Sequence, residues 1–217
     1  MNYINFHTHK SFIDNHIISI ENVFPEDYLE GNYHSDKISV GIHPWFIQGD
    51  GQYQMQLMRT ILSDQKVVFI GEAGLDKLQG GDFLRQESIF LKQIWLSEEF
   101  NKPLVIHCVK AYNEIISLRK KIKPSLPWIF HGFSSSVPVM EQALDVGFYF
   151  SYGVALLNDA SKTVTTFCKT PLDRCFLETD EADVGIEILY QRAADLRRCE
   201  VAQIEDEMKC NFKWLLK

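Results

Sequence analysis

Eight short runs of β-branched and aromatic residues recur along the chain, and most of them are apolar throughout. Near-continuous apolar runs are typical of parallel strands that helices cover, because both faces of such strands are buried. The runs span residues 3–6, 17–20, 38–42, 67–70, 104–106, 128–130, 148–151 and 175–177. We therefore expect eight parallel strands.

Helical patterns separate several of these runs. The clearest covers residues 83–100, where Phe83, Phe90, Ile94 and Trp95 fall on one side at spacings close to a helical period. Others cover 111–122 and 137–144, and one long helix or a pair of helices covers 186–216. Residues 10–37 have room for a strand but not for two full helices, so we expect reduced helices near the N-terminus. This alternation predicts an α/β fold, a compact TIM-type (β/α)8 barrel, formed as a single domain over residues 1–217.

The charge and cysteine content narrow the class of protein. A net charge of -7 argues against binding nucleic acid through a broad basic surface, so any phosphate recognition must be local. The five cysteines show no Cys-x-x-Cys spacing, which favours reduced thiols over a disulfide framework. The N-terminus lacks a basic-then-apolar signal pattern, and no stretch approaches the ~20 apolar residues of a membrane span. We expect a cytoplasmic protein that does not bind a membrane.

Six side chains that commonly bind metals stand where five of the expected strands end. They are His7 and His9 after the first run, Glu72 after the fourth, His107 after the fifth, His131 after the sixth and Asp180 after the eighth. Residues i and i+2 of a strand project to the same side, so both imidazoles of the His-x-His pair can reach one point. Because the carboxyl ends of barrel strands converge on the active site, we expect all six side chains to meet there.

This set of side chains predicts a metal centre. Imidazoles with two carboxylates suit zinc, manganese or iron better than calcium, and magnesium stays possible. A carboxylate such as Glu72 can bridge two divalent ions about 3.5–4 Å apart, and such a pair activates water for hydrolysis. We therefore expect a hydrolase with two divalent metal ions. Asp180 is assigned as a ligand and also as the general base for the attacking water.

Taken in order, these segments resemble the TatD family of metal-dependent hydrolases, within the amidohydrolase-like superfamily. The motifs that carry the resemblance are Phe6-His7-Thr8-His9, Gly41-Ile42-His43-Pro44, Gly71-Glu72-Ala73-Gly74-Leu75-Asp76, Val105-Ile106-His107, Phe130-His131-Gly132-Phe133-Ser134 and Glu178-Thr179-Asp180. The resemblance implies one ion held by His7, His9 and Asp180. It implies a second held by His107 and His131, with Glu72 bridging the two. It also implies DNA as a substrate, because many members are described as deoxyribonucleases.

The residues around the expected site depart from the family pattern. Asn5 stands where an Asp usually precedes the His-x-His pair, and Val109 stands where an Arg usually follows the fifth-strand His. Losing that Arg removes a bidentate phosphate contact, although Lys110 offers a point charge. We expect His43 and Lys110 to contact substrate. Glu178 is expected to be a buried hydrogen-bonding or salt-bridge partner that fixes the mouth of the barrel.

Three functions remain open. The first is DNase-like hydrolysis of a phosphodiester, with DNA or a small phosphoester as substrate, which the resemblance and Lys10, Lys77 and Lys110 favour. The second is hydrolysis of a small-molecule amide or ester on the same site, which the acidic charge and Val109 favour. The third is a non-catalytic barrel, which the intact ligand set disfavours. A polymerase-and-histidinol-phosphatase type barrel also opens with His-x-His, but the segment around Glu72 fits the TatD resemblance better. The sequence indicates no obligate protein partner.

Overall fold

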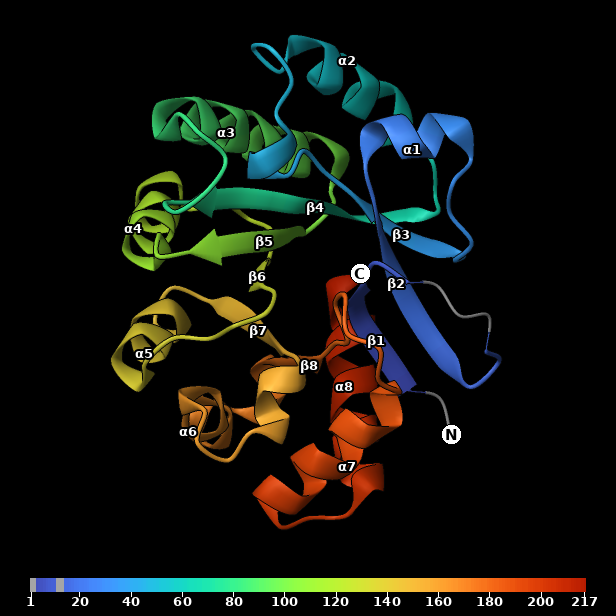
Figure 1. The fold of residues 1–217 in the computed structure, drawn as a ribbon, viewed down its shortest axis with the longest axis vertical. Coiled ribbons are helices and arrows are strands. Elements are labelled where there is room, and N and C mark those ends of the chain that lie inside the picture. Colours follow the sequence, from blue (N-terminus) through green and yellow to red (C-terminus); the bar gives the residue numbers. More distant parts are fainter. Residues whose placement is uncertain (1–2, 11–13) are drawn as a thin grey trace.

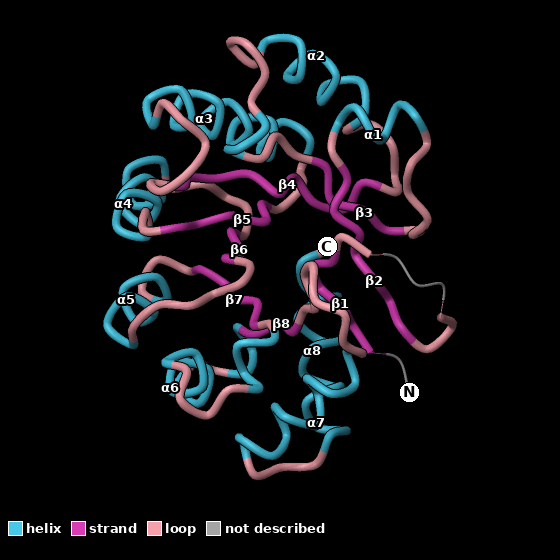
Figure 2. The backbone as a smooth tube through the Cα atoms, in the orientation of Figure 1, coloured by secondary structure: helices cyan, strands magenta, loops and turns pink. Residues whose placement is uncertain are grey.

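The computed structural model describes residues 3–10 and 14–217, and in these residues the chain forms a parallel sheet of eight strands. The strands follow one another in chain order around a barrel (Figures 1 and 2). They are β1 (Tyr3–Thr8), β2 (Ile17–Val23), β3 (Lys37–Val40), β4 (Val67–Asp76), β5 (Leu104–Val109), β6 (Trp128–Phe130), β7 (Phe148–Tyr152) and β8 (Cys175–Leu177). The predicted TIM-type barrel is confirmed, and each strand overlaps its predicted run.

Helices surround the barrel on the outside, as Figure 1 shows. They are α1 (Pro25–Glu30), α2 (Gln52–Ile61), α3 (Phe83–Phe100), α4 (Tyr112–Ile122), α5 (Val137–Leu144), α6 (Lys162–Lys169), α7 (Ile186–Arg197) and α8 (Val201–Leu215). Short 3-10 helices follow β3 (η1, Pro44–Phe46) and β7 (η2, Val154–Leu157) and precede β8 (η3, Leu172–Arg174). The expected reduction near the N-terminus is confirmed, because α1 has only six residues. Among the described residues, no helix combines the length and apolar character that crossing a bilayer requires.

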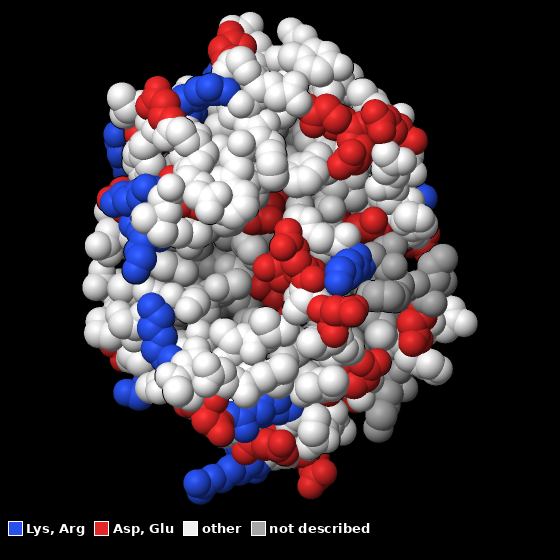
Figure 3. Space-filling view, in the orientation of Figure 1, with Lys and Arg blue, Asp and Glu red and all other residues white. Residues whose placement is uncertain are grey.

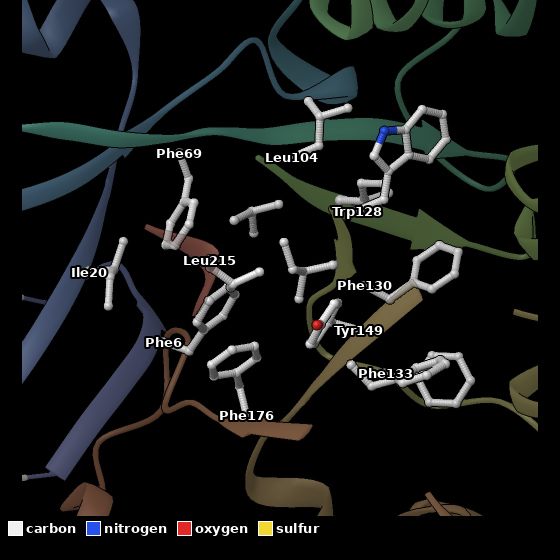
Figure 4. Packing of buried hydrophobic residues seen from close by; sticks show 14 of the residues in the cluster. Phe6, Ile20, Phe69, Leu104, Trp128, Phe130, Phe133, Tyr149, Phe176 and Leu215 are labelled. Carbon is white, nitrogen blue, oxygen red and sulfur yellow. The ribbon is translucent and has the colours of Figure 1, made fainter. Parts of the chain in front are cut away.

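Aromatic side chains fill the inside of the barrel. The rings of Phe6 and Phe176 stack with centroids 4.3 Å apart, and Phe69 lies 5.3 Å from Phe6. Figure 4 shows these rings turned toward one another, with Leu215 of α8 beside them. All three phenylalanines are fully buried. The interior is therefore a packed core that supports the strand ends above it, as in other barrels of this type.

The barrel closes where β1 meets the end of β8. A parallel bridge joins Thr8 to Asp180, in which the Asp180 N–H donates to the His7 carbonyl (3.0 Å) and the His9 N–H donates to the Asp180 carbonyl (3.1 Å). The Asn5 amide donates to Thr179 Oγ1 (2.8 Å) and accepts from the Thr179 N–H (3.0 Å). Asp180 adopts φ 54°, a left-handed conformation that Asp tolerates better than most residues. Closure therefore places Asp180 directly beside the His-x-His pair.

Gly41 lets the backbone that follows β3 approach β4 closely. A Cβ on Gly41 would lie 2.6 Å from the Gly71 Cα and 2.8 Å from the Glu72 carbonyl oxygen. Both obstacles are backbone atoms, which cannot rotate away as a side chain can. The absence of a side chain at Gly41 is therefore a condition for the position of Glu72.

We predict that Gly41→Ala lowers the free energy of unfolding by about 3 kcal/mol or more, the upper range for forced overpacking, because the strands must separate. Gly31→Ala is the control, since that Cβ would meet no atom within 4 Å and costs only the left-handed φ of 74°, about 1 kcal/mol. Denaturant unfolding of both variants and the parent measures the difference. Equal losses in the two variants would contradict this account.

Candidate metal centre

The two histidines of the His-x-His pair point at the same pair of carboxylates. The Nε2 atoms of His7 and His9 lie 3.5 and 3.6 Å from Glu72 Oε2. The same two nitrogens lie 3.7 and 3.6 Å from Asp180 Oδ1. The β1–β2 register shifts between Asn5 and Thr8, and His9 stands just beyond the strand. The expectation that both imidazoles reach one point is confirmed geometrically.

The other oxygen of Glu72 faces a second group of imidazoles. Glu72 Oε1 lies 2.6 Å from His107 Nδ1, 2.7 Å from His131 Nε2 and 3.2 Å from His43 Nε2. His43 Nε2 also lies 3.2 Å from His107 Nδ1. His43 was expected to contact substrate, but its ring belongs to this inner group and is buried. Glu72 therefore sits between two sets of nitrogen donors, one on each carboxylate oxygen.

The strand positions of two of these residues differ from the prediction. Glu72 was expected to follow a strand that ends at residue 70, and His107 was expected to end its strand. In the structure β4 continues through Glu72 to Asp76, and β5 continues through His107 to Val109. These two strands pair as far as Asp76 with Val109, and that pairing explains the extension. His131 and Asp180 do follow their strands as expected.

Burial and charge make this a site for cations. Burial alone would raise the pKa of the Glu72 carboxyl, but the imidazoles of His131, His107 and His43 outweigh it and hold that pKa well below its usual value. Glu72 is therefore an almost fully buried carboxylate that stays ionised. A buried negative charge is costly unless a positive charge lies beside it. Metal binding requires neutral imidazoles, which supply lone pairs but no charge, so a bound divalent cation would then supply the positive charge beside Glu72.

The spacing of the donor atoms around His7 and His9 fits an ion between them, whereas His107 and His131 lie at hydrogen-bond distance from Glu72. Two donors bound at zinc distances in tetrahedral geometry lie about 3.3 Å apart, close to the 3.5–3.7 Å separations between the His7 and His9 nitrogens and their carboxylates. Both ring nitrogens of His7 are buried without a hydrogen-bond partner in the described chain. Three overlapping groups could each hold an ion: His7, His9 and Glu72; His7, His131 and Asp180; and His43, Glu72 and His107.

Asp76 orients His107 from the side opposite Glu72. Asp76 Oδ2 lies 3.2 Å from His107 Nε2 and accepts a hydrogen bond from Trp45 Nε1 (2.7 Å). Its Oδ1 accepts from the N–H groups of Leu78 and Gln79 (2.7 and 2.9 Å). An ionised carboxylate can only accept hydrogen bonds, so Asp76 favours a proton on Nε2, and this tautomer would leave the Nδ1 lone pair for a bound ion in place of the Glu72 contact. A carboxylate behind a histidine ligand is a common support of metal centres.

Glu178 lies behind His131 in the same way that Asp76 lies behind His107. It is fully buried, its Oε1 lies 3.6 Å from His131 Nδ1, and it accepts a hydrogen bond from the Gly132 N–H. Burial alone would raise the pKa of Glu178, but His131 outweighs it and lowers that pKa. The sequence-based interpretation of Glu178 as a buried partner at the mouth agrees with this placement.

The lysines near the mouth offer less positive charge than the sequence suggested. Lys10 pairs with Asp183 (3.7 Å), and Lys77 pairs with Glu114. Lys110 follows β5 with φ 56°, is exposed, and forms no ion pair within the described residues. Figure 3 shows acidic side chains gathered at the hollowed centre of this face, with most lysines and arginines toward its edge. A neighbouring hollow of about 330 Å³ is lined by Gly132–Phe133, Gly153–Ala155, Thr163 and Glu178–Ala182.

Two residues of the site were given no role from the sequence. Asp76 ends the Glu72 motif, and a strand period of two places its side chain on the same side as that of Glu72. Trp45 follows His43-Pro44, and nothing in its spacing indicated that its indole would contact Asp76 in another strand. The position of Asp76 could therefore be predicted from the sequence. The contact of Trp45 with Asp76 could not, because it depends on how β3 and β4 lie side by side.

Comparison with known proteins agrees with this geometry. The family model described as TatD related DNase matches residues 28–209. An uncharacterized metal-dependent hydrolase of Haemophilus influenzae is 30% identical over 172 residues, which are 76% of this chain and 63% of that protein. YcfH of Escherichia coli K12, also described as an uncharacterized metal-dependent hydrolase, is 28% identical over 70% of this chain and 58% of its own length. The chain thus spans about three fifths of these bacterial relatives.

A human protein described as the 3'-5' RNA nuclease TATDN2 is 30% identical over 74% of this chain and 21% of its own length. Among solved structures, the TatD homolog YjjV of E. coli superposes with a TM-score of 0.84 at 23% identity, over 99% of this chain and 97% of that one. A TatD family hydrolase of Entamoeba histolytica gives a TM-score of 0.78 at 16% identity, over 99% and 98% of the two chains. The structures share the fold, and the family model covers most of the sequence, so this chain belongs to the TatD-related DNase family.

Proposed function

We propose that this protein is a divalent-metal-dependent hydrolase that cleaves phosphodiester bonds, in the manner of a DNase. The observation that carries the proposal is the position of Glu72, whose two oxygens face separate groups of imidazoles. In this proposal one ion is held by His7, His9 and Asp180 and a second by His107 and His131, with Glu72 between them. Family membership and the nuclease description of the human relative support a phosphodiester substrate.

The residues divide the chemistry among them. Divalent ions at such a centre polarise a phosphoryl oxygen and lower the pKa of water. Asp180 has the most exposed side chain of the six candidate ligands, 41% exposed, whereas those of Glu72 and His7 are buried. Asp180 is therefore placed to take the proton from the attacking water at the substrate side. Asp76 and Glu178 orient His107 and His131 from behind.

A second candidate is hydrolysis of a small-molecule amide or ester at the same site. The observation that favours it is the pairing of Lys10 with Asp183 and of Lys77 with Glu114, which leaves little free positive charge for phosphates. The two candidates are separated by assaying the metal-loaded protein on single-stranded DNA, bis-nitrophenyl phosphate and simple amides. Turnover of the amides alone would overturn the phosphodiester proposal.

We predict that the protein binds about two equivalents of zinc, manganese or iron, because the imidazoles and carboxylates form two donor groups. Replacing both His7 and His9 by Ala should remove at least one equivalent. The control replaces both His16 and His34, which are exposed, by Ala. Elemental analysis of the folded proteins measures the content, and an unchanged content in the first variant would refute this ligand assignment.

For Asp180→Asn we expect kcat on a phosphodiester to fall by on the order of 10² or more, because the amide keeps the size but loses the basicity. The fold and the ion held by His107 and His131 should be retained. The measurement is kcat per folded, metal-loaded molecule. A value within about threefold of the parent, far short of the effect of a general base, would show that Asp180 does not have this role.

For Asp76→Asn we expect metal affinity to fall by about 10- to 100-fold, the usual effect of losing a carboxylate behind a histidine ligand. The amide can offer an N–H to His107 Nε2, which favours the tautomer that protonates the nitrogen facing the site. Competition with a chelator measures the affinity without relying on turnover. Asp183→Asn is the control, because that carboxylate contacts Lys10 and not an imidazole. Equal affinities in both variants would argue against a positioning role.

A further inference from the structure

Three aromatic side chains lie along one side of the candidate metal centre, and we call Phe24, Trp45 and Phe46 the aromatic flank. The Trp45 ring lies 4.9 Å from the His43 ring and 5.6 Å from the His107 ring, centroid to centroid. The Phe46 ring lies 5.4 Å from His43 and 5.1 Å from Phe24, whose ring is 6.4 Å from His9. The flank therefore runs along the ligand cluster from His107 to His9.

The flank exposes apolar surface directly beside buried polar groups. Trp45 is 42% exposed and Phe46 is 52% exposed, while His43, against which both rings pack, is 5% exposed. Exposed aromatic rings beside a catalytic centre retain free faces for a ligand, because water is a poor partner for them. These rings occupy the rim of the site, where a substrate bound to the centre would lie.

The backbone holds these rings in place before any ligand arrives. Trp45 and Phe46 belong to η1, where Pro44 fixes the first turn and His43 Nδ1 accepts from the Trp45 N–H (3.1 Å). Gln54 donates to the Phe46 carbonyl (3.0 Å), and the Trp45 indole donates to Asp76. A rigid aromatic surface loses little conformational entropy when a ligand stacks on it.

The mouth of the barrel offers few free cations to bind phosphates, and the aromatic flank offers stacking surface instead. Proteins that bind single-stranded nucleic acid combine cations for the backbone with aromatic rings for the bases. Here Lys10 and Lys77 are already paired with carboxylates, which leaves Lys110 as the one exposed lysine of these three without an ion pair in the described residues. Binding energy for an oligonucleotide must then come mainly from the metal centre and from stacking.

We propose that the aromatic flank is a stacking site for a nucleobase next to the scissile phosphodiester, an inference that rests on the proposed function. The substrate class is single-stranded nucleic acid, because both faces of a base inside a duplex are already covered by its neighbours. Trp45 and Phe46 determine specificity by holding an unpaired base on the flank while the adjoining phosphate reaches the metal centre. Sequence preference is weak, since every base has a π-face.

The test compares a short single-stranded thymidylate oligomer with versions that lack one base at each position in turn. Base removal keeps the phosphodiester backbone and its charge, so the comparison isolates stacking from phosphate binding. With metal-loaded parent protein, loss of one particular base should raise KM on the order of tenfold, within the range known for base–aromatic stacking. In Phe46→Ala that ratio should fall below about threefold, while Trp45→Phe, which keeps a ring, should retain most of it.

Tyr53→Ala is the matched control, since Tyr53 is an equally exposed ring (59%) on α2 outside the flank, and its ratio should equal that of the parent. Metal content is measured for every variant, so that a loss of ions is not mistaken for a loss of stacking. If KM is indifferent to removal of every base while all the oligomers are cleaved, stacking is refuted and the proposed function stands. If no oligomer is cleaved but aryl esters are, both are overturned and the flank binds the aryl group of a small ester.

Discussion

Two backbone hydrogen bonds between the ends of β1 and β8 hold together both the barrel and its candidate site. They join Asp180 to the backbone of His7 and His9, the same residues whose side chains face Glu72. Closure of the sheet and assembly of the site are therefore one event. Asn5 reinforces the junction between the same two strands through two hydrogen bonds to Thr179. Its side-chain amide donates in one of them and accepts in the other. A carboxylate at position 5 could only accept hydrogen bonds, so the Thr179 hydroxyl would then have to donate to it rather than accept.

The buried negative charge of Glu72 favours the binding of cations in this closed site. Its carboxylate is nearly fully buried, and the imidazoles of His131, His107 and His43 hold its pKa well below the usual value. Packing alone does not favour that arrangement, because burying a charge is costly unless it is paired or coordinates a metal. Gly41 lets the backbone just after β3 approach β4, Gly71 lets β4 approach β5, and together they fix where this charge is buried. Asp76 and Glu178, which lie behind the imidazoles, are carboxylates as well. With neutral imidazoles, the region therefore carries negative charge that its own residues do not balance.

The mouth differs in character from the centre beneath it. The candidate ligand side chains lie on the strands or just beyond their ends, above the packed core, whereas the groups that would select a substrate come from η1 and from the loops after β1, β4 and β5. There, carboxylates pair with Lys10 and Lys77. The exposed rings of Trp45 and Phe46, rather than cationic side chains, form part of the surface beside the centre. Barrels of this type vary their substrates through these loops while the strands stay the same.

The order of strands, the longest helix and the six candidate ligands could all be predicted from the sequence, because apolar runs and the residues that end them are local features of the chain. His131 and Asp180 follow their strands as the predicted strand ends indicated, whereas β1 continues through His7 to Thr8. The sequence patterns did not predict helices α2 and α6. Helix α6 contains several Thr residues, which favour strands by propensity, and its buried Phe167 packs on Tyr152 of β7. The continuation of β4 to Asp76 depended on pairing with β5, and the contact of Trp45 with Asp76 depended on the approach of β3 to β4. Sequence determined the order of the strands and which polar residues lie at or near their carboxyl ends. Tertiary structure alone decided which of them face each other, because register and lateral distance between strands arise from the packing of the whole barrel.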